Sequence, residues 1–356
     1  MLIVRSPVRI SFGGGGTDLP AYYQQHGGAV LSTTINKYFY TILGSRSDEY
    51  IQIISSDLRL CESWRGLSAM DIQGSGLEIP VAALKDLDRE IYIDLFLASE
   101  IPPGTGLGSS ASVCVNVVKT LTSYLQMPLS KLDLAERAFH IARNVLHRHV
   151  GKQDEYAAAF GGLNFIEFQP DGTASVQPID PGPSTVTELQ NNLLLFFTGS
   201  AHHSWGILAE QERSTQEKDH KSLAALHEIK ELAFRMRDAL KAGELRGFAS
   251  MLNESWLAKK QVSSKISNSR IDILYELAIQ SGALGGKITG AGGGGFLLLY
   301  CESPHQDRLR NAFAAEGLKE MTFSFDFQGA QVLVNDPFID NDEHSASRWT
   351  FVPAAS

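Results

Sequence analysis

A glycine- and serine-rich segment, Glu100–Ser112, has the composition of a phosphate-binding loop. An apolar stretch, Ile91–Leu97, precedes it, and apolar residues at helical spacing follow it. The pattern therefore predicts a strand, a glycine loop and a helix in that order. Glycines let the backbone approach a ligand, and the first turn of a helix offers unpaired N–H groups to an anion. We expect an anion site here; the alternative is a capped helix after a tight turn.

Two serines close this loop. Ser109 and Ser110 could cap the helix, and either hydroxyl could reach a phosphate or its metal ion. The sequence lacks the classical P-loop pattern, in which a lysine followed by Ser or Thr ends the loop. The loop would therefore bind phosphate through its backbone without that lysine.

A second glycine-rich segment, Arg9–Pro20, lies near the amino terminus. Its four consecutive glycines interrupt an apolar strand pattern at a cost of roughly 0.5–1 kcal/mol each, which is usually accepted where backbone approaches a ligand. Asp18 could accept hydrogen bonds from sugar hydroxyls, and Arg9 could hold an anion or a developing alkoxide. The alternative is a glycine bulge in which Asp18 caps a turn.

A third glycine-rich segment, Gly285–Gly295, contains the spacing G-x-G-x-x-G. A dinucleotide site requires a helix after this motif, but the apolar strand Phe296–Tyr300 follows, so we reject that interpretation. Lys287 could supply charge beside bound phosphates, or it could be a solvated loop lysine. Asp154, between an expected loop and a short helix, could be a general base or a helix cap.

The composition is that of an ordinary globular protein. The 356 residues are 43% hydrophobic and 20% charged, with a formal net charge of −9, and allow a large core or two domains. The acidic balance argues against a nucleic-acid surface, and the apolar runs are too short to span a membrane. Three widely spaced cysteines predict reduced thiols and a cytoplasmic protein. Arg5 and Arg9 interrupt the first apolar residues, so no signal peptide is expected.

Strands dominate the first part of the sequence and helices the later part, which predicts an α+β fold. The proline-rich stretch Pro170–Thr187 is the best candidate boundary, and it gives domains over 1–180 and 181–335 with a loose tail at 336–356. Helices are expected over Leu129–His149, Trp205–Ala242, Leu245–Lys260 and Asp272–Ser281, and strands over Tyr38–Leu43, Tyr50–Ile54, Gly161–Phe168 and Asn192–Thr198.

Together these segments resemble the GHMP small-molecule kinases, which include galactokinase and mevalonate kinase. Three blocks match in order, Ser6–Asp18, Pro102–Ser112 and Lys287–Gly295, within a resemblance that spans residues 4–325. The motifs Gly-Gly-Gly-Thr-Asp and Gly-Lys-Gln-Asp-x-Tyr-Ala-Ala resemble those of the sugar 1-kinase branch. Members of this branch include D-glycero-D-manno-heptose 7-phosphate kinases and the kinase part of L-fucokinase. The resemblance implies a two-domain fold, S5-like then ferredoxin-like, with the site between the domains.

The resemblance also implies ATP as phosphate donor, Mg²⁺ as cofactor, and roles for residues at matching positions. Asp154 would be the catalytic base, and Arg9 would assist near the reacting oxygen. Ser110 would also reach Mg²⁺. The residues expected around the ATP phosphates are Pro103, Gly104, Gly106, Leu107, Gly108, Ser109 and Ser110. Those expected at the sugar are Gly14, Gly15, Thr17, Asp18, Lys152, Gln153, His202 and Lys287.

Two departures from the family pattern concern the metal and the substrate. Related kinases usually carry a Mg²⁺-binding glutamate about a dozen residues before the base, but Ile141–Asn144 contains no acid, and the neighbouring acids are Glu136 and Glu155. This branch often carries an arginine after Phe197-Thr198-Gly199, where this chain has His202 nearby. A histidine would hold a sugar phosphate less firmly near pH 7.

We therefore predict phosphoryl transfer from ATP to the anomeric (C1) hydroxyl of a sugar, with D-glycero-D-manno-heptose 7-phosphate as the first candidate. A 1-kinase for an unphosphorylated sugar such as fucose or galactose is one alternative. A kinase-like sugar and nucleotide sensor without catalysis is another. The expected partners are the sugar or sugar phosphate and ATP, with no nucleic acid or membrane, and a homodimer is left open.

Overall fold

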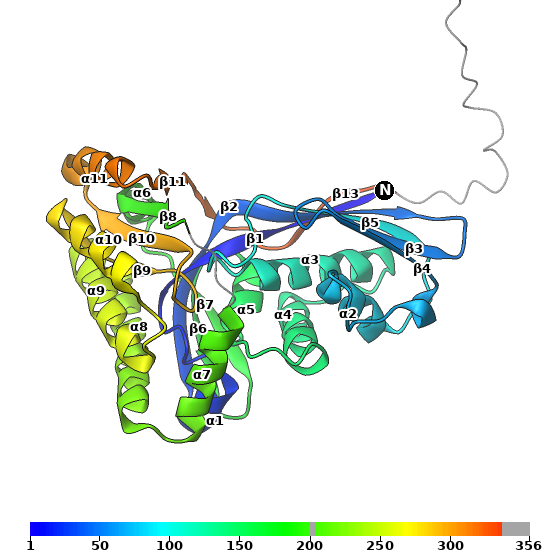
Figure 1. Cartoon of the computed structure of the whole chain (residues 1–356), viewed down its shortest axis with the longest axis horizontal. Helices are drawn as coiled ribbons and strands as arrows, with labels where there is room; N and C mark the ends of the chain where they lie inside the picture. The colour runs from blue at the N-terminus through cyan, green and yellow to red at the C-terminus, as the bar shows by residue number, and fades with distance from the viewer. Residues whose placement is uncertain (200–203, 337–356) are drawn as a thin grey trace, which may run out of the picture.

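Two β-sheets with helices packed against them form an α+β architecture in this computed structural model, which describes residues 1–199 and 204–336 (Figure 1). The elements before residue 180 are β1 (Leu2–Gly13), α1 (Pro20–His26), β2 (Gly28–Ser45), β3 (Tyr50–Ser55), β4 (Leu60–Arg65), η1 (Leu67–Ala69), α2 (Glu78–Leu87), β5 (Ile93–Ser99), α3 (Ser109–Tyr124), α4 (Lys131–His140), η2 (Ile141–Val145), α5 (Gln153–Phe160), β6 (Leu163–Phe168) and β7 (Ala174–Pro178).

The later elements alternate between the smaller sheet and the helices around it. They are α6 (Pro183–Asn192), β8 (Leu193–Phe197), α7 (Ser204–Gln216), α8 (His220–Ala242), α9 (Leu245–Val262), α10 (Ser269–Gln280), β9 (Ala283–Ile288), β10 (Phe296–Cys301), α11 (Ser303–Ala315), β11 (Lys319–Glu320), β12 (Phe325–Asp326) and β13 (Gln331–Asn335).

The larger sheet is built around the long antiparallel pair β1 and β2. Its main order is β13-β1-β2-β5-β3-β4, and β6, β7 and β12 join it along β2. Helices α2, α3 and α4 lie against one side of this sheet in Figure 1. Val115, Val118 and Leu121 of α3 are buried in the same apolar cluster as strand residues Leu43 and Leu95. This packing holds α3, and with it the end of the glycine loop that precedes α3, against the sheet.

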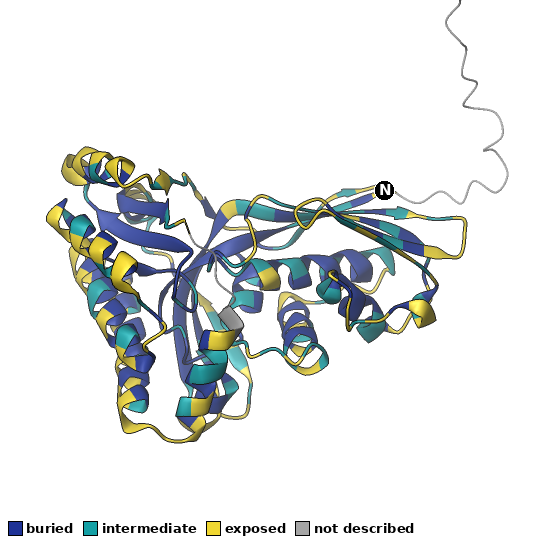
Figure 2. Cartoon of the chain, in the orientation of Figure 1, coloured by how far each residue is buried: buried dark blue, intermediate teal, exposed yellow. Residues whose placement is uncertain are grey.

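The smaller sheet, β11-β8-β10-β9, is antiparallel and contacts the larger one through a shared core. Side chains of a strand alternate between its two faces. Accordingly Leu297 and Leu299 of β10 pack in one apolar cluster, while Leu298 lies in another that contains Ile10 and Phe12 of β1. In Figure 2 long stretches of β1, β9 and β10 are dark blue, the colour of buried residues. The four glycines that directly follow Phe12 are therefore held close to where the two sheets meet.

Several expected elements differ from the observed ones. The long helix expected over Trp205–Ala242 is two helices, and Asp219 caps the second by accepting a hydrogen bond from the Ser222 N–H at 2.9 Å. Helix α1 and strand β9 were not expected. Strand β9 matters most because it places Lys287 in a buried strand instead of a solvated loop. The expected loose tail falls almost wholly outside the described residues.

The division at residue 180 remains a prediction, and β12 and β13, from the end of the described chain, pair with β2 and β1. Among the helices in the described ranges, none has the length and apolar content needed to cross a bilayer.

Candidate active site

The glycine loop lies between β5 and α3, as the sequence predicts. Gly104, Gly106 and Gly108 have φ values of +74°, +82° and +76°, a conformation that favours glycine. Helix α3 has Gly108 as its cap residue and begins at Ser109, so the expectation that Ser109 or Ser110 caps it is wrong. Both serines instead occupy the first turn, where backbone N–H groups have no partner within the helix. The geometry leaves these donors for an anion.

The third glycine-rich segment shapes this loop from the other sheet. A Cβ atom on Gly106 would lie 2.4 Å from the carbonyl oxygen of Thr289, and one on Gly290 would lie 2.6 Å from the Cα atom of Gly106. A Cβ on Gly295 would lie 2.3 Å from the carbonyl oxygen of Thr105. The glycines thus allow two backbone segments to pack directly against each other.

Arg9 connects the candidate base to the glycine loop. Arg9 is only 4% exposed, and its Nε and Nη2 atoms donate to the two carboxylate oxygens of Asp154, each at 2.7 Å. Its Nη1 atom donates to the Gly106 carbonyl oxygen at 2.6 Å. Asp154 is the second residue of α5, so the expected loop-to-helix position is confirmed. A bidentate pair of this kind fixes both side chains in one orientation.

Asp18 lies beside this pair at the end of the amino-terminal glycine segment. One carboxylate oxygen accepts hydrogen bonds from the Gly16 N–H at 2.8 Å and the Gln153 Nε2 at 3.3 Å, and the other accepts from the Gln153 N–H at 3.2 Å. A Cβ atom on Gly151 would lie 1.9 Å from the latter oxygen. Burial, followed by the charge of Asp154, raises the pKa of Asp18 above its ordinary value.

Three other residues predicted to contact the sugar, Gly14, Thr17 and Lys152, make their contacts within the protein. Thr17 is fully buried, and its hydroxyl donates to the Gly14 carbonyl oxygen at 2.8 Å. Gly14 packs against Ala29, whose carbonyl oxygen would lie 1.8 Å from an added Cβ. The Lys152 ammonium donates to Glu136 at 2.6 Å, and Lys152 does not line the cavity that Arg9, Asp18 and Asp154 share. His202 falls outside the described residues.

Two adjoining cavities meet at the glycine loop. The first, about 110 Å³ and named the polar cavity here, is the more polar of the two: Arg9, Asp18 and Asp154 line it together with residues that include Gly15, Gln153, Lys259 and Lys287. The second, about 430 Å³, is more apolar and is lined by residues that include Phe39, Leu58, Ile79, Pro80, Leu97 and Pro103. Gly104, Ser109 and Ser110 line both. An extended ligand with a polar end and a flat apolar end would fit across the loop. Leu107 is itself buried in the core.

Buried polar atoms without a hydrogen-bond partner gather at the polar cavity. Among the described residues, Ser11 Oγ, Ser109 Oγ, Gln153 Oε1 and Glu155 Oε2 have no partner, and all four residues line it. Leaving such a group unpaired costs about 1–3 kcal/mol, so a cluster of them indicates a ligand site.

Glu155 is the acidic residue best placed for a metal ion. It is buried beside Asp154, and burial raises the pKa of Glu155 well above its ordinary value. The other neighbouring acid, Glu136, is occupied by Lys152 and Tyr156. Mg²⁺ commonly takes one or two carboxylates and draws its remaining ligands from phosphates and water. Glu155 and the loop serines fit such an ion, although the described residues contain no group of three His, Cys, Asp or Glu that could hold a metal.

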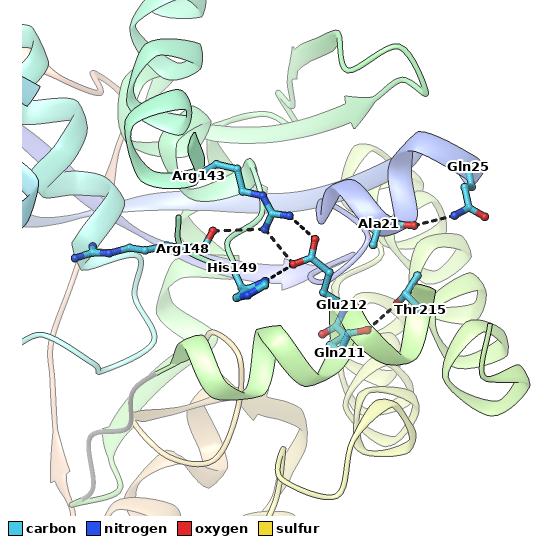
Figure 3. Close-up of polar contacts among 8 residues, drawn as sticks. All are labelled: Ala21, Gln25, Arg143, Arg148, His149, Gln211, Glu212 and Thr215. Atoms are coloured by element: carbon cyan, nitrogen blue, oxygen red, sulfur yellow. Dashed lines mark hydrogen bonds and ion pairs between the residues drawn. The ribbon is translucent and has the colours of Figure 1, made fainter. Parts of the chain in front are cut away.

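Helix α7 is fastened over the amino-terminal glycine segment by a charged cluster (Figure 3). Glu212 of α7 is 3% exposed and accepts hydrogen bonds from Arg143 Nη2 and His149 Nδ1, each at 2.5 Å. Burial alone would raise the pKa of Glu212, but these hydrogen bonds outweigh it and hold the pKa below its ordinary value. The neighbouring Gln211 donates to the Gly16 carbonyl oxygen at 3.2 Å. The cluster therefore positions α7 against the loop that carries Asp18.

No sequence pattern singles out two residues of this site, Lys259 and Glu212. Lys259 is followed by Lys260 near the end of an amphipathic helix, where charged residues are usually solvated. Glu212 lies in a helix rich in polar residues. Their burial arises from contacts with segments far away in the chain.

Comparisons with known proteins agree with this geometry. The family model of the GHMP kinases N terminal domain matches residues 78–162, and that of the GHMP kinases C terminal matches residues 236–319. A D-glycero-alpha-D-manno-heptose 7-phosphate kinase of Campylobacter jejuni is 32% identical over 92% of this chain and 97% of the relative.

The chain belongs to the GHMP kinase family.

Its fold is accordingly the two-domain GHMP kinase fold. A crystal structure of a D-glycero-D-manno-heptose 1-phosphate kinase from Bacteroides thetaiotaomicron superposes with a TM-score of 0.79 at 27% identity, covering 95% of this chain and all of that one. An L-fucokinase/L-fucose-1-P guanylyltransferase of Bacteroides fragilis is 27% identical over 84% of this chain and 34% of the relative. This GHMP kinase is an enzyme that transfers phosphate to a hydroxyl of a carbohydrate, with ATP as the donor.

Proposed function

We propose that this GHMP kinase transfers the γ-phosphoryl group of ATP to the anomeric (C1) hydroxyl of a sugar, with D-glycero-D-manno-heptose 7-phosphate as the first candidate. The observation that carries the proposal is the Arg9–Asp154 ion pair, which contacts the glycine loop and lines the same polar cavity as Asp18. A base, a phosphate-binding loop and a hydroxyl-binding carboxylate thereby line one cavity. Phosphoryl transfer depends chiefly on such positioning and on neutralising charge.

In this mechanism Asp154 accepts the proton of the C1 hydroxyl, and the resulting oxygen forms a bond to the γ-phosphorus atom. The bond from that phosphorus to the β–γ bridging oxygen breaks, and ADP leaves with the electron pair. Arg9 orients Asp154 and brings positive charge close to the reacting oxygen. Asp18, held by Gln153, accepts hydrogen bonds from sugar hydroxyls, and Gly15 lets the sugar approach the backbone.

The glycine loop and the first turn of α3 hold the phosphates in this proposal, through Gly104, Gly106, Gly108 and Ser109. The apolar second cavity, on the other side of the loop, takes the adenine and ribose. Mg²⁺ would be held by Ser110 and Glu155 and, when bound, would neutralise charge on the phosphate oxygens. Pro103 lines the cavity proposed for the nucleoside, and Leu107 anchors the loop in the core.

A 1-kinase for an unphosphorylated sugar remains the second candidate, because the chain also resembles 34% of a protein named L-fucokinase/L-fucose-1-P guanylyltransferase. The names of the two heptose kinases also differ in the phosphate that they mention, position 7 in one and position 1 in the other. Both the acceptor and the phosphorylated carbon must therefore be determined.

The deciding experiment is an ADP-release assay with a panel of sugars, followed by ³¹P NMR of the product. The panel contains D-glycero-D-manno-heptose 7-phosphate, the same heptose without phosphate, L-fucose and D-galactose. We expect turnover of the heptose 7-phosphate and a new anomeric phosphate signal. A product phosphorylated at another carbon would refute the assignment of C1. Cytoplasmic location, the division at residue 180 and a homodimer remain predictions that this assay leaves aside.

A further inference from the structure

Two buried lysines from different elements face the polar cavity. Lys259 of α9 is 6% exposed and Lys287 of β9 is 5% exposed. The Lys259 ammonium donates to the Gly15 carbonyl oxygen at 2.9 Å, and the Lys287 ammonium donates to the Phe12 carbonyl oxygen at 3.4 Å. No carboxylate among the described residues lies within ion-pair distance of either ammonium. Each lysine therefore keeps donors that the protein itself does not use.

This arrangement is costly in the absence of a ligand. Moving an ammonium group out of water without a counter-charge is strongly unfavourable. Burial, offset in part by Asp18, lowers the pKa of Lys259 to about 8. Burial, the neighbouring Lys259 and Arg9 together lower the pKa of Lys287 to about 7. Because Asp154 already neutralises the charge of Arg9, the single carboxylate of Asp18 faces the ammonium groups of both lysines.

We propose that Lys259 and Lys287 together bind one phosphoryl group of a substrate, an inference that deepens and rests on the proposed kinase function. A phosphate monoester carries a charge of about −1.5 to −2 near pH 7 and several acceptor oxygens, which matches two ammonium groups with free donors. Lysine binds phosphate in this way, as a point charge. The phosphoryl group comes either from the γ position of ATP or from the sugar phosphate, because the loop proposed to hold the ATP phosphates and the residues proposed to hold the sugar both line this cavity.

The pair predicts a measurable uptake of protons. At pH 8 the free protein carries Lys287 largely neutral and Lys259 about half protonated, by the pKa values of about 7 and about 8. A bound dianion favours the charged form of both lysines, so binding takes up between about one and two protons per site at this pH. At pH 6 both lysines are already charged, and the uptake by the lysines disappears.

Calorimetric titration tests the proposal with Lys259→Met and Lys287→Met, which keep most of the apolar side chain and remove the ammonium group. The ligands are ADP, a non-hydrolysable ATP analogue, the heptose 7-phosphate and the heptose without phosphate. Titrations at pH 8 in two buffers with different heats of ionisation give the number of protons taken up. We expect each variant to weaken the phosphorylated ligand by about 10–100-fold and to reduce the proton uptake. Lys260→Met is the matched control, since Lys260 is the next residue and pairs with Asp272 at the surface.

The pattern of losses identifies the source of the phosphoryl group. Weaker binding of the ATP analogue with unchanged binding of ADP assigns the γ-phosphoryl group. Weaker binding of the heptose 7-phosphate with unchanged binding of the free heptose assigns the sugar phosphate. Unchanged affinity for every ligand overturns the proposal. If one variant does not fold, unchanged affinity of the other variant for every phosphorylated ligand overturns the proposal, because the two lysines are proposed to bind the group together.

The same measurements separate this inference from the proposed function. Wild-type protein that turns over no sugar in the panel, yet binds a phosphorylated ligand in a lysine-dependent way, would refute the C1-kinase proposal and keep the lysine site. Variants with wild-type turnover and wild-type affinities would keep the kinase and refute the lysine site.

Discussion

Replacing Asp154 with Asn tests the proposed base with a minimal change of shape. A general base contributes about 10²–10⁴-fold to turnover, so we expect kcat to fall by that factor. At about 1.36 kcal/mol for each tenfold change, the loss corresponds to about 2.7–5.4 kcal/mol of transition-state stabilisation. The amide cannot accept the hydroxyl proton at neutral pH, whereas the carboxylate can.

The contacts of Asp154 predict a second, separable effect. Both of its oxygens accept hydrogen bonds from Arg9 at 2.7 Å, but Asn offers only one oxygen and turns an NH₂ group toward the guanidinium. Losing one charge-assisted hydrogen bond costs about 1.5–3 kcal/mol of stability. Arg9 also contacts the Gly106 carbonyl oxygen, so part of this cost could reach the nucleotide loop.

The assay must therefore measure binding as well as turnover. Calorimetry with the ATP analogue gives the affinity, and the ADP-release assay at saturating ATP and sugar gives kcat. We expect an affinity within about threefold of wild type, below the tenfold that about 1.4 kcal/mol would produce. Asp307→Asn is the control, because Asp307 is 97% exposed on α11 and far from the cavity in sequence and fold. If Asp154→Asn keeps wild-type kcat under saturating conditions, Asp154 is not the base.

Three further variants address the loop, the metal and helix α7. Gly106→Ala should weaken binding of the ATP analogue by at least tenfold, because the new Cβ atom would lie 2.4 Å from the Thr289 carbonyl oxygen and Gly106 has a φ of +82°. Calorimetry measures this affinity, and an unchanged value would contradict the assignment of the loop. Glu155→Gln should raise the Mg²⁺ concentration needed for half-maximal activity and weaken Mn²⁺ binding measured by electron paramagnetic resonance in the presence of ADP, and an unaltered metal dependence would exclude Glu155 as a ligand. Glu212→Gln should cost about 1–3 kcal/mol at pH 7 in urea unfolding. Because the folded-state pKa of Glu212 is lowered, its stabilisation is present above the ordinary value and is lost as the pH falls, so the variant and wild type should converge in acid, and parallel pH profiles would contradict the pairing.

Local patterns were sufficient to predict the parts of the site that depend on one segment. The strand, glycine loop and helix around Gly106 follow from hydrophobic spacing and from glycine composition, and the structure places them as expected. Asp154 at the start of a helix follows from its position between a loop and an apolar run. The serine caps were predicted wrongly because Gly108, with its positive φ, already ends the loop and takes the cap position itself.

The rest of the site depends on contacts between distant segments, which a sequence pattern does not record. Lys287 follows glycines, so its segment has little apolar periodicity, and only pairing with Leu298 of β10 makes it a buried strand. Lys259 is buried because its helix packs toward the amino-terminal glycines. Helix α7 ends at Gln216, and Lys218 two residues later adopts a φ of +56°, although polar helix formers continue through that stretch.

Contacts between the two sheets, more than any single motif, determine the shape of the phosphate-binding loop. Gly106 is pressed against Thr289 on one side and accepts a hydrogen bond from Arg9 on the other, so the loop has little freedom while both contacts hold. Arg9 in turn fixes the orientation of Asp154. Lys287 belongs to β9, the strand that ends directly before Thr289. A shift between the sheets would therefore move the loop, the base and the lysine pair together. Positioning for catalysis is thus built into the packing that stabilises the fold, which explains why glycines are needed where the segments touch.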